Sequence, residues 1–270
     1  MRIIDAHLHF KRESYFDNIA RAAGHENTAE HLAQEYRRLN IAGGVVMGNE
    51  SAENIACTYP SPLCYCVGLG GDASAFANVI QKISLIETHL QRKTCVGIKL
   101  YPGYQHFYIY DDFLAPLYKI AAKYNKPVAV HTGLLAGNNS DMKYSHPRVV
   151  GEAAARFPAV KFVMCHFGEP HFTDAAEVLI KHTNVSADLS GILEGKIPNM
   201  EMFCRNRKYY IDQLRAQTAR INNYDRLMFG TDWPLANLED YIEFTKIVIP
   251  QSEWDKVFFA NANRIYSLNL

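Results

Sequence analysis

Eight short apolar runs recur along the chain, and this repetition constrains the fold more than any other feature. Each run is rich in strand-forming residues and is followed by a stretch with helical periodicity. Alternating strands and helices predict a parallel sheet covered by helices, and eight such units can close into a (β/α)₈ barrel. An open, doubly wound sheet is the alternative. The runs cover residues 3–7, 44–47, 63–67, 95–99, 127–131, 160–166, 185–189 and 226–230.

The length of the chain fits this architecture. Its 270 residues suit one α/β domain, because barrels of this class often reach this size undivided. We therefore expect a single TIM-barrel domain over residues 1–270. Apolar stripes at helical spacing predict covering helices between the runs. The clearest of them span about residues 76–90, 114–124, 147–157 and 252–268.

The charge of the chain excludes several kinds of partner. Lys and Arg together number 28, as do Asp and Glu, so there is no net positive charge for nucleic acid or an anionic membrane. No apolar run is long enough to span a bilayer, and the six cysteines form no CxxC pair. We expect a cytoplasmic protein that acts on a small molecule. A homo-oligomer is compatible with the sequence.

The first strand candidate contains the residues Asp5-Ala6-His7-Leu8-His9. Residues two apart in a strand point to the same face, so His7 and His9 would project side by side. This is an arrangement that favours metal binding.

Other strand candidates also end in residues that bind metals or transfer protons. Lys99 ends the fourth, His131 the fifth and His166 the sixth, and Asp232 follows the eighth. The intervals from Lys99 to His131 and from His131 to His166 are similar, and the interval to Asp232 is about twice as long. All strand ends of a parallel barrel open on one face, so these residues would meet in one cavity.

Imidazole and carboxylate groups suit zinc and other borderline divalent ions, with one position open for water. Such an ion can lower the pKa of water to about 7. Each residue alone has a simpler interpretation: a single histidine at a strand end is often hydrogen-bonded in the core, and Asp232 fits a turn or helix cap. Lys99 fits pairing with a carboxylate, binding of a substrate anion, or a carbamate that bridges two metals.

Further side chains would lie near the same rim. His106 and His171 are weaker candidates for substrate contact. Four aromatic residues would suit a flat or ring-shaped substrate, although aromatic side chains near strand ends often serve packing. They are Tyr101, Tyr104, Phe167 and Trp233.

At these positions the chain resembles the amidohydrolase superfamily, in its amidohydrolase-related branch of metal-dependent (β/α)₈ barrels. The similar segments extend over the whole chain. They are DAHLHF, VGIKLYPGYQHF, KPVAVHTG, HPRVVGEAAARFPAVKFVMCHFG, FGTDWP and FANANRIYSL.

The resemblance implies that His7, His9, His131 and Asp232 hold a divalent metal, with zinc expected and manganese an alternative. His166 would lie close by as an acid/base or polarising group. In a two-metal variant, His131 and His166 would hold the second ion and a carboxylated Lys99 would bridge. Asp232 would transfer the proton of the attacking water to the leaving group.

By the same resemblance we expect a hydrolase that cleaves an amide, cyclic amide, lactone or ester bond of a small molecule. A decarboxylase of an aromatic or unsaturated acid is the alternative, since some members of the branch are decarboxylases. Such members often carry an acidic residue in place of one of the first histidines, whereas this chain keeps both His7 and His9. A barrel without catalytic activity is a further alternative, which the complete ligand set argues against.

Overall fold

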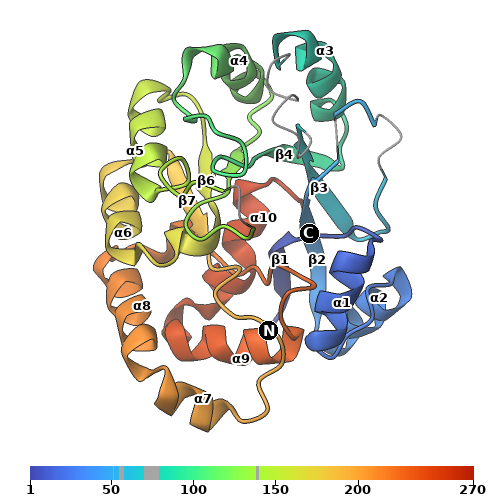
Figure 1. Cartoon of the computed structure of the whole chain (residues 1–270), viewed down its shortest axis with the longest axis vertical. Coiled ribbons are helices and arrows are strands. Elements are labelled where there is room, and N and C mark those ends of the chain that lie inside the picture. Colours follow the sequence, from blue (N-terminus) through green and yellow to red (C-terminus); the bar gives the residue numbers. More distant parts are fainter. Residues whose placement is uncertain (51, 55–57, 70–78, 138–139) are drawn as a thin grey trace.

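The computed structural model describes residues 1–50, 52–54, 58–69, 79–137 and 140–270. Within them, eight strands form one sheet in the order β1 to β8, and each strand pairs in parallel with the next. The eight-stranded parallel architecture predicted from the sequence is confirmed. Figure 1 shows the helices arranged around the strands in chain order, with α3, α4, α5, α6 and α8 along the periphery.

The strands are β1 Ile3–Leu8, β2 Ile41–Met47, β3 Leu63–Gly68, β4 Cys95–Leu100, β5 Val128–Val130, β6 Phe162–Met164, β7 Val185–Asp188 and β8 Leu227–Met228. The helices are α1 Ser14–Ala22, α2 Ala29–Arg38, α3 Val79–Leu90, α4 Ala115–Lys123, α5 Pro147–Arg156, α6 Phe172–Lys181, α7 Met200–Asn206, α8 Lys208–Arg220, α9 Leu238–Val248 and α10 Asn261–Ile265. Residues 76–78 of the first predicted helix lie outside the described part.

The barrel closes between β1 and the segment that follows β8. Ala6 N–H donates to the Phe229 carbonyl at 2.9 Å, and His9 N–H donates to the Trp233 carbonyl at 2.7 Å. Leu8 and Trp233 also form a parallel bridge. Sequence positions from opposite ends of the chain are therefore direct neighbours in the barrel wall.

Two apolar clusters show how the barrel is filled. The inner one joins buried residues of seven strands with Ala262, Ile265 and Tyr266 of the final helical segment, a set that can meet only inside the barrel. The outer one lies between strands and helices and includes Leu117 of α4 and Leu179 of α6. Strands buried on both faces explain the nearly continuous apolar runs in the sequence.

A register shift in β1 places the histidines. Ile4 and Ala6 belong to the inner cluster and Leu8 to the outer one, so the facing of the side chains reverses between residues 6 and 8. The pairing with β2 shifts in register over the same stretch. Because of this shift, His7 and His9 both face the barrel interior, on the same side as expected for residues two apart in a strand. Without it, His7 would face outward, since Ile4 and Ala6 face inward and side chains alternate along a strand.

The C-terminal helical segment differs in detail from the predicted helix over about 252–268. It begins with a 3₁₀ turn at Gln251–Glu253, contains a π-helical stretch at Lys256–Ala260, and ends at Ile265.

Among the described residues, no helix has both the length and the apolar character needed to cross a membrane.

Candidate metal centre

Three electron-pair donors converge where β1 ends beside the loop after β8. His7 Nε2 lies 3.3 Å and His9 Nε2 lies 3.1 Å from the same oxygen, Asp232 Oδ1. The backbone holds this arrangement, because Asp232 N–H donates to the His7 carbonyl at 2.8 Å. Asp232 has a φ of +60°, a left-handed conformation that aspartate tolerates better than most residues.

The hydrogen bonds of the two histidines fix which ring nitrogen faces Asp232 with a lone pair. His9 Nδ1 lies 2.7 Å from Asn49 Oδ1 and 3.2 Å from the Met47 carbonyl, and both oxygens only accept. His7 Nδ1 lies 3.0 Å from Asp188 Oδ2. In the neutral form of each imidazole, Nδ1 therefore carries the ring hydrogen, and Nε2 then presents a lone pair toward the carboxylate.

This arrangement fits a divalent metal ion. His7 Nε2 and Asp232 Oδ1 are buried and make no hydrogen bond within the described part of the chain, whereas buried polar atoms are normally partnered. Ligand atoms of His7, His9 and Asp232 all lie within 4.8 Å of one another. In the neutral form of both rings, the facing lone pairs repel unless a cation, either a proton or a metal ion, lies among them. Two imidazoles and a carboxylate are also a common donor set for zinc.

Asp188, at the end of β7, supports His7 from behind, and the sequence analysis missed it. Its Oδ2 accepts from His7 Nδ1, and its Oδ1 accepts from His166 N–H at 3.0 Å and from the Ser190 hydroxyl at 2.5 Å. A carboxylate that orients a metal-binding histidine is a recurrent device. The only signal in the sequence was an acidic residue at the end of an apolar run.

His131 and His166 form a second facing pair beside the first group. His131 Nδ1 lies 3.1 Å from His166 Nε2, and the rings of His7 and His166 are 4.7 Å apart. His131 Nε2 lies 2.9 Å from the Leu134 carbonyl, and His166 Nδ1 lies 3.2 Å from the Ser190 carbonyl. Since both carbonyls only accept, the two nitrogens between the rings present lone pairs. The structure thus brings all five predicted ligands together.

The loop after β7 packs directly against the imidazole ring of His166 and fixes its position. His166 has a φ of +62°, which is unusual for a residue with a side chain. Gly191, with a φ of +67°, approaches the ring so closely that an added Cβ would lie 2.5 Å from His166 Nδ1. Only glycine fits there without displacing the imidazole.

Lys99 lies inside the barrel, fully buried. Its Nζ donates to Cys165 Sγ at 2.9 Å and lies 5.0 Å from the centre of the Tyr101 ring. No carboxylate oxygen of the described residues forms an ion pair with it. Of the three interpretations, pairing with a carboxylate is therefore not what the structure shows.

Burial and neighbouring charges set the protonation of the site. Burial, opposed by the charge of Asp232, lowers the pKa of His166 to about 4. Burial, His166 and Lys99 hold the pKa of His131 well below its usual range. Burial would raise the pKa of Asp232, but the adjacent His7 and His9 hold it far below its ordinary value. At neutral pH, the imidazoles of His131 and His166 are uncharged and the carboxylate of Asp232 is ionised, which are the forms that bind metals. Burial opposes the charged form of His7, but the negative charge of Asp188 raises the pKa of His7 well above its usual range.

The aromatic candidates divide into two groups. Trp233 and Phe167 are fully buried and serve packing, and Tyr101 is partly buried. Tyr104 is 39% exposed, and its ring meets His131 edge to face at 5.0 Å. Its hydroxyl accepts from Ala136 N–H at 2.9 Å, which fixes the ring at the mouth of the site.

The two further histidines lie away from this centre. His106 is exposed and stacks on Tyr144, and His171 contacts His146 at the start of α5.

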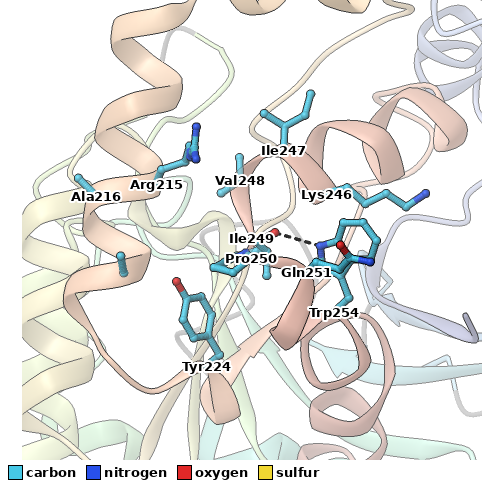
Figure 2. A pocket seen from close by; sticks show the side chains of 11 residues that line it. Arg215, Ala216, Tyr224, Lys246, Ile247, Val248, Ile249, Pro250, Gln251 and Trp254 are labelled. Atoms are coloured by element: carbon cyan, nitrogen blue, oxygen red, sulfur yellow. Dashed lines mark hydrogen bonds between the residues drawn. The ribbon is translucent and has the colours of Figure 1, made fainter.

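A groove of about 510 Å³ lies between α8 and the segment after α9 (Figure 2). It contains no histidine, cysteine or acidic side chain, and Tyr224 places it at the amino ends of the strands. It is therefore not part of the metal centre.

Comparisons with known proteins agree with this architecture. The model of the amidohydrolase family matches residues 4–268. No curated protein matches the sequence.

Three solved structures have the same fold. A candidate 2-pyrone-4,6-dicarboxylic acid hydrolase from Pseudomonas putida is 16% identical, with a TM-score of 0.66 over 100% of this chain and 98% of that one. An amidohydrolase from Burkholderia multivorans with bound zinc is 17% identical, with a TM-score of 0.65 over 99% of both chains. A dihydroxybenzoic acid decarboxylase from Polaromonas sp. JS666, with bound manganese and the inhibitor 2-nitroresorcinol, is 13% identical, with a TM-score of 0.61 over 100% of this chain and 98% of that one.

At these identities the solved structures establish the fold alone. The family model, in contrast, spans nearly the whole sequence, including the segments that carry the converging histidines and Asp232. The chain belongs to the amidohydrolase family.

Proposed function

We propose that this protein is a metal-dependent hydrolase that cleaves an amide, cyclic amide, lactone or ester bond of a small molecule. The observation that carries the proposal is the convergence of five donors, from His7, His9, His131, His166 and Asp232, at the carboxyl end of the barrel. Active sites of this fold lie at that end.

These five residues would hold one or two divalent ions, with zinc or manganese supported by two structures of the same fold, one with bound zinc and one with bound manganese. The ion would supply Lewis-acid activation of water and of the scissile carbonyl. His7, His9 and Asp232 would form one ligand group, and the facing nitrogens of His131 and His166 would form the other.

Asp232 is proposed as the group that moves the proton. It is ionised, so it can accept the proton of the attacking water and pass it to the leaving group. His166 is held neutral by burial, so its Nε2 lone pair beside His7 suits it to bind the second ion or, when a single ion is bound, to accept a proton.

Lys99 is proposed to act through the histidines rather than on the substrate. It is fully buried behind Cys165, so contact with a substrate would require rearrangement of the barrel interior. Its positive charge lowers the pKa values of His131 and His166, which keeps both imidazoles available as ligands. In this role Lys99 is a positioning residue.

The substrate mouth favours a flat or ring-shaped molecule. Tyr104 lies against His131, and the ring of Phe16 lies 5.8 Å from that of His9. Both rings therefore border the ligand groups. Aromatic surfaces of this kind stack with planar groups of a ligand.

Decarboxylation of an aromatic or unsaturated acid is the second candidate, because one relative with the same fold is a dihydroxybenzoic acid decarboxylase. Product analysis in ¹⁸O-labelled water distinguishes the two reactions. Panels of small lactones, cyclic amides and hydroxybenzoic acids serve as probes. A hydrolase incorporates one labelled oxygen per turnover without releasing CO₂, and release of CO₂ without label would reject hydrolysis.

The role of Asp232 has a direct test. Asp232→Asn keeps the size of the side chain but removes the proton acceptor, so turnover should fall by about 10²-fold or more while the fold survives. The circular dichroism spectrum monitors the fold. An unchanged rate in this variant would remove Asp232 from the mechanism.

A further inference from the structure

A second group of metal-binding side chains lies outside the metal centre, where α5 and α6 begin. His146 is the N-cap of α5, His171 precedes α6, and Asp174 lies in the first turn of α6. We refer to these three residues as the α5–α6 cluster. Neither the ligand set proposed above nor any step of the reaction uses them.

The side chains of the α5–α6 cluster face one another. His146 Nε2 lies 3.3 Å from Asp174 Oδ2, and the two imidazole rings are 4.3 Å apart. One ligand atom from each residue lies within 4.8 Å of the others. Metal–ligand distances of about 2.0–2.2 Å place neighbouring ligands roughly 3–4 Å apart, so small side-chain rotations would complete a site.

An unpartnered atom points to a missing ligand. His171 Nε2 is buried, although the residue as a whole is only partly buried, and it makes no hydrogen bond within the described ranges. Buried imidazole nitrogens normally have a partner. A metal ion would provide one.

Arg148 holds the carboxylate in place for such an ion. Its Nη2 and Nε donate to Asp174 Oδ1 at 2.8 Å and 3.1 Å, which leaves Oδ2 facing His146. Ligating carboxylates are commonly oriented by hydrogen bonds of this kind. The ion pair therefore does not occupy the oxygen that a metal would need.

We propose that the α5–α6 cluster binds a divalent transition metal of the zinc type through His146, His171 and Asp174. The ion would join α5 to the loop of residues 165–171, which carries His166. This loop already packs closely on α5, since a Cβ at Gly168 would lie 2.3 Å from the ring of Pro147. A metal here would make the position of His166 more rigid without taking part in the reaction.

Binding has a local cost that limits its affinity. His146 Nδ1 accepts from Arg148 N–H at 3.3 Å, a long hydrogen bond. Ligation through Nε2 places the ring hydrogen on Nδ1, so this bond is lost. We therefore expect the α5–α6 cluster to bind zinc more weakly than the metal centre.

The test measures the number of zinc ions bound per protein chain. The protein is equilibrated with excess zinc, freed of loosely bound metal, and analysed by elemental mass spectrometry. His171→Ala and Asp174→Asn should each contain one zinc ion per chain fewer than the wild type. His182→Ala, at the other end of α6, is the matched control and should retain the full content. Equal zinc content in the wild type and in both cluster variants would overturn the proposal.

A second measurement separates this site from the metal centre and from misfolding. In a His9→Ala background, which weakens the metal centre, zinc should still raise the melting temperature. The addition of His171→Ala should reduce that shift to the residual effect of the weakened metal centre, whereas the melting temperature of the zinc-free protein should change little. A zinc-induced shift of the same size in the double variant as in His9→Ala would place the ion elsewhere. The outcome does not depend on turnover, so failure of the proposed function would not affect it.

Discussion

Replacement of Asp188 by asparagine tests the metal centre through a residue that makes no contact with substrate. Asp188 Oδ1 accepts from His166 N–H, Ser190 N–H and the Ser190 hydroxyl. These three donors require an oxygen, so in Asp188→Asn the amide NH₂ would turn toward His7 Nδ1. That nitrogen would then have to accept, and the ring hydrogen would move to Nε2, the atom that faces Asp232.

The size of the effect follows from this tautomer change. His7 would have to give up the new hydrogen bond of its Nδ1 before Nε2 could bind an ion. Loss of an orienting carboxylate typically lowers metal affinity about 10- to 100-fold. This corresponds to about 1.4–2.7 kcal/mol of binding free energy.

Competition titration against a zinc chelator measures the change. The experiment is done in a His171→Ala background, so that the α5–α6 cluster does not contribute. Asp141→Asn is the control, because Asp141 is a partly exposed residue that pairs with Lys143. An Asp188→Asn protein that folds normally and binds zinc as tightly as its parent would refute the reasoning about His7.

Three further predictions follow from the geometry. Gly191→Ala should lower turnover and destabilise the fold by about 1–2 kcal/mol, because its Cβ would displace His166; thermal unfolding and rate measurements check this. Burial and the adjacent His31 lower the pKa of His25 to about 4, so its neutral form stabilises the fold above pH 6.5. This contribution, on the order of 1–2 kcal/mol after screening, should be lost as the pH falls toward 4, and His25→Asn should remove that pH dependence in urea titrations. Chelation should lower the melting temperature and zinc should restore it, whereas an unchanged value would contradict metal binding.

Much of the fold was predictable because its signals are local. Strands buried on both faces must be apolar over several residues, so all eight were visible as runs. The convergence of His7, His9 and Asp232 was also predictable, because the ends of parallel strands share one face of a barrel. These predictions required only the order of the elements.

The details that complete the site depend on contacts across the barrel. Asp188 and Ser190 look like ordinary strand-end residues until β7 lies between β6 and β8. Asn49, which fixes the tautomer of His9, lies on another strand end with no periodic signal. The register shift in β1 results from pairing with β2 and cannot be read from either segment alone.

Lys99 illustrates the same limit. Its position at the end of an apolar run suggested the mouth of the barrel, where a substrate anion or a carbamate could lie. In the structure it points to Cys165 within the interior. This contact reaches from β4 past β5 to the segment after β6, so only the closed arrangement of the strands determines it.

The central claim is that His7, His9 and Asp232 share a metal ion. Crystals of the zinc-loaded protein, measured at the zinc absorption edge, test it most directly. We expect an anomalous peak within about 2.0–2.2 Å of His7 Nε2, His9 Nε2 and an Asp232 carboxylate oxygen. A fully zinc-loaded crystal with no peak among these three side chains would contradict the account.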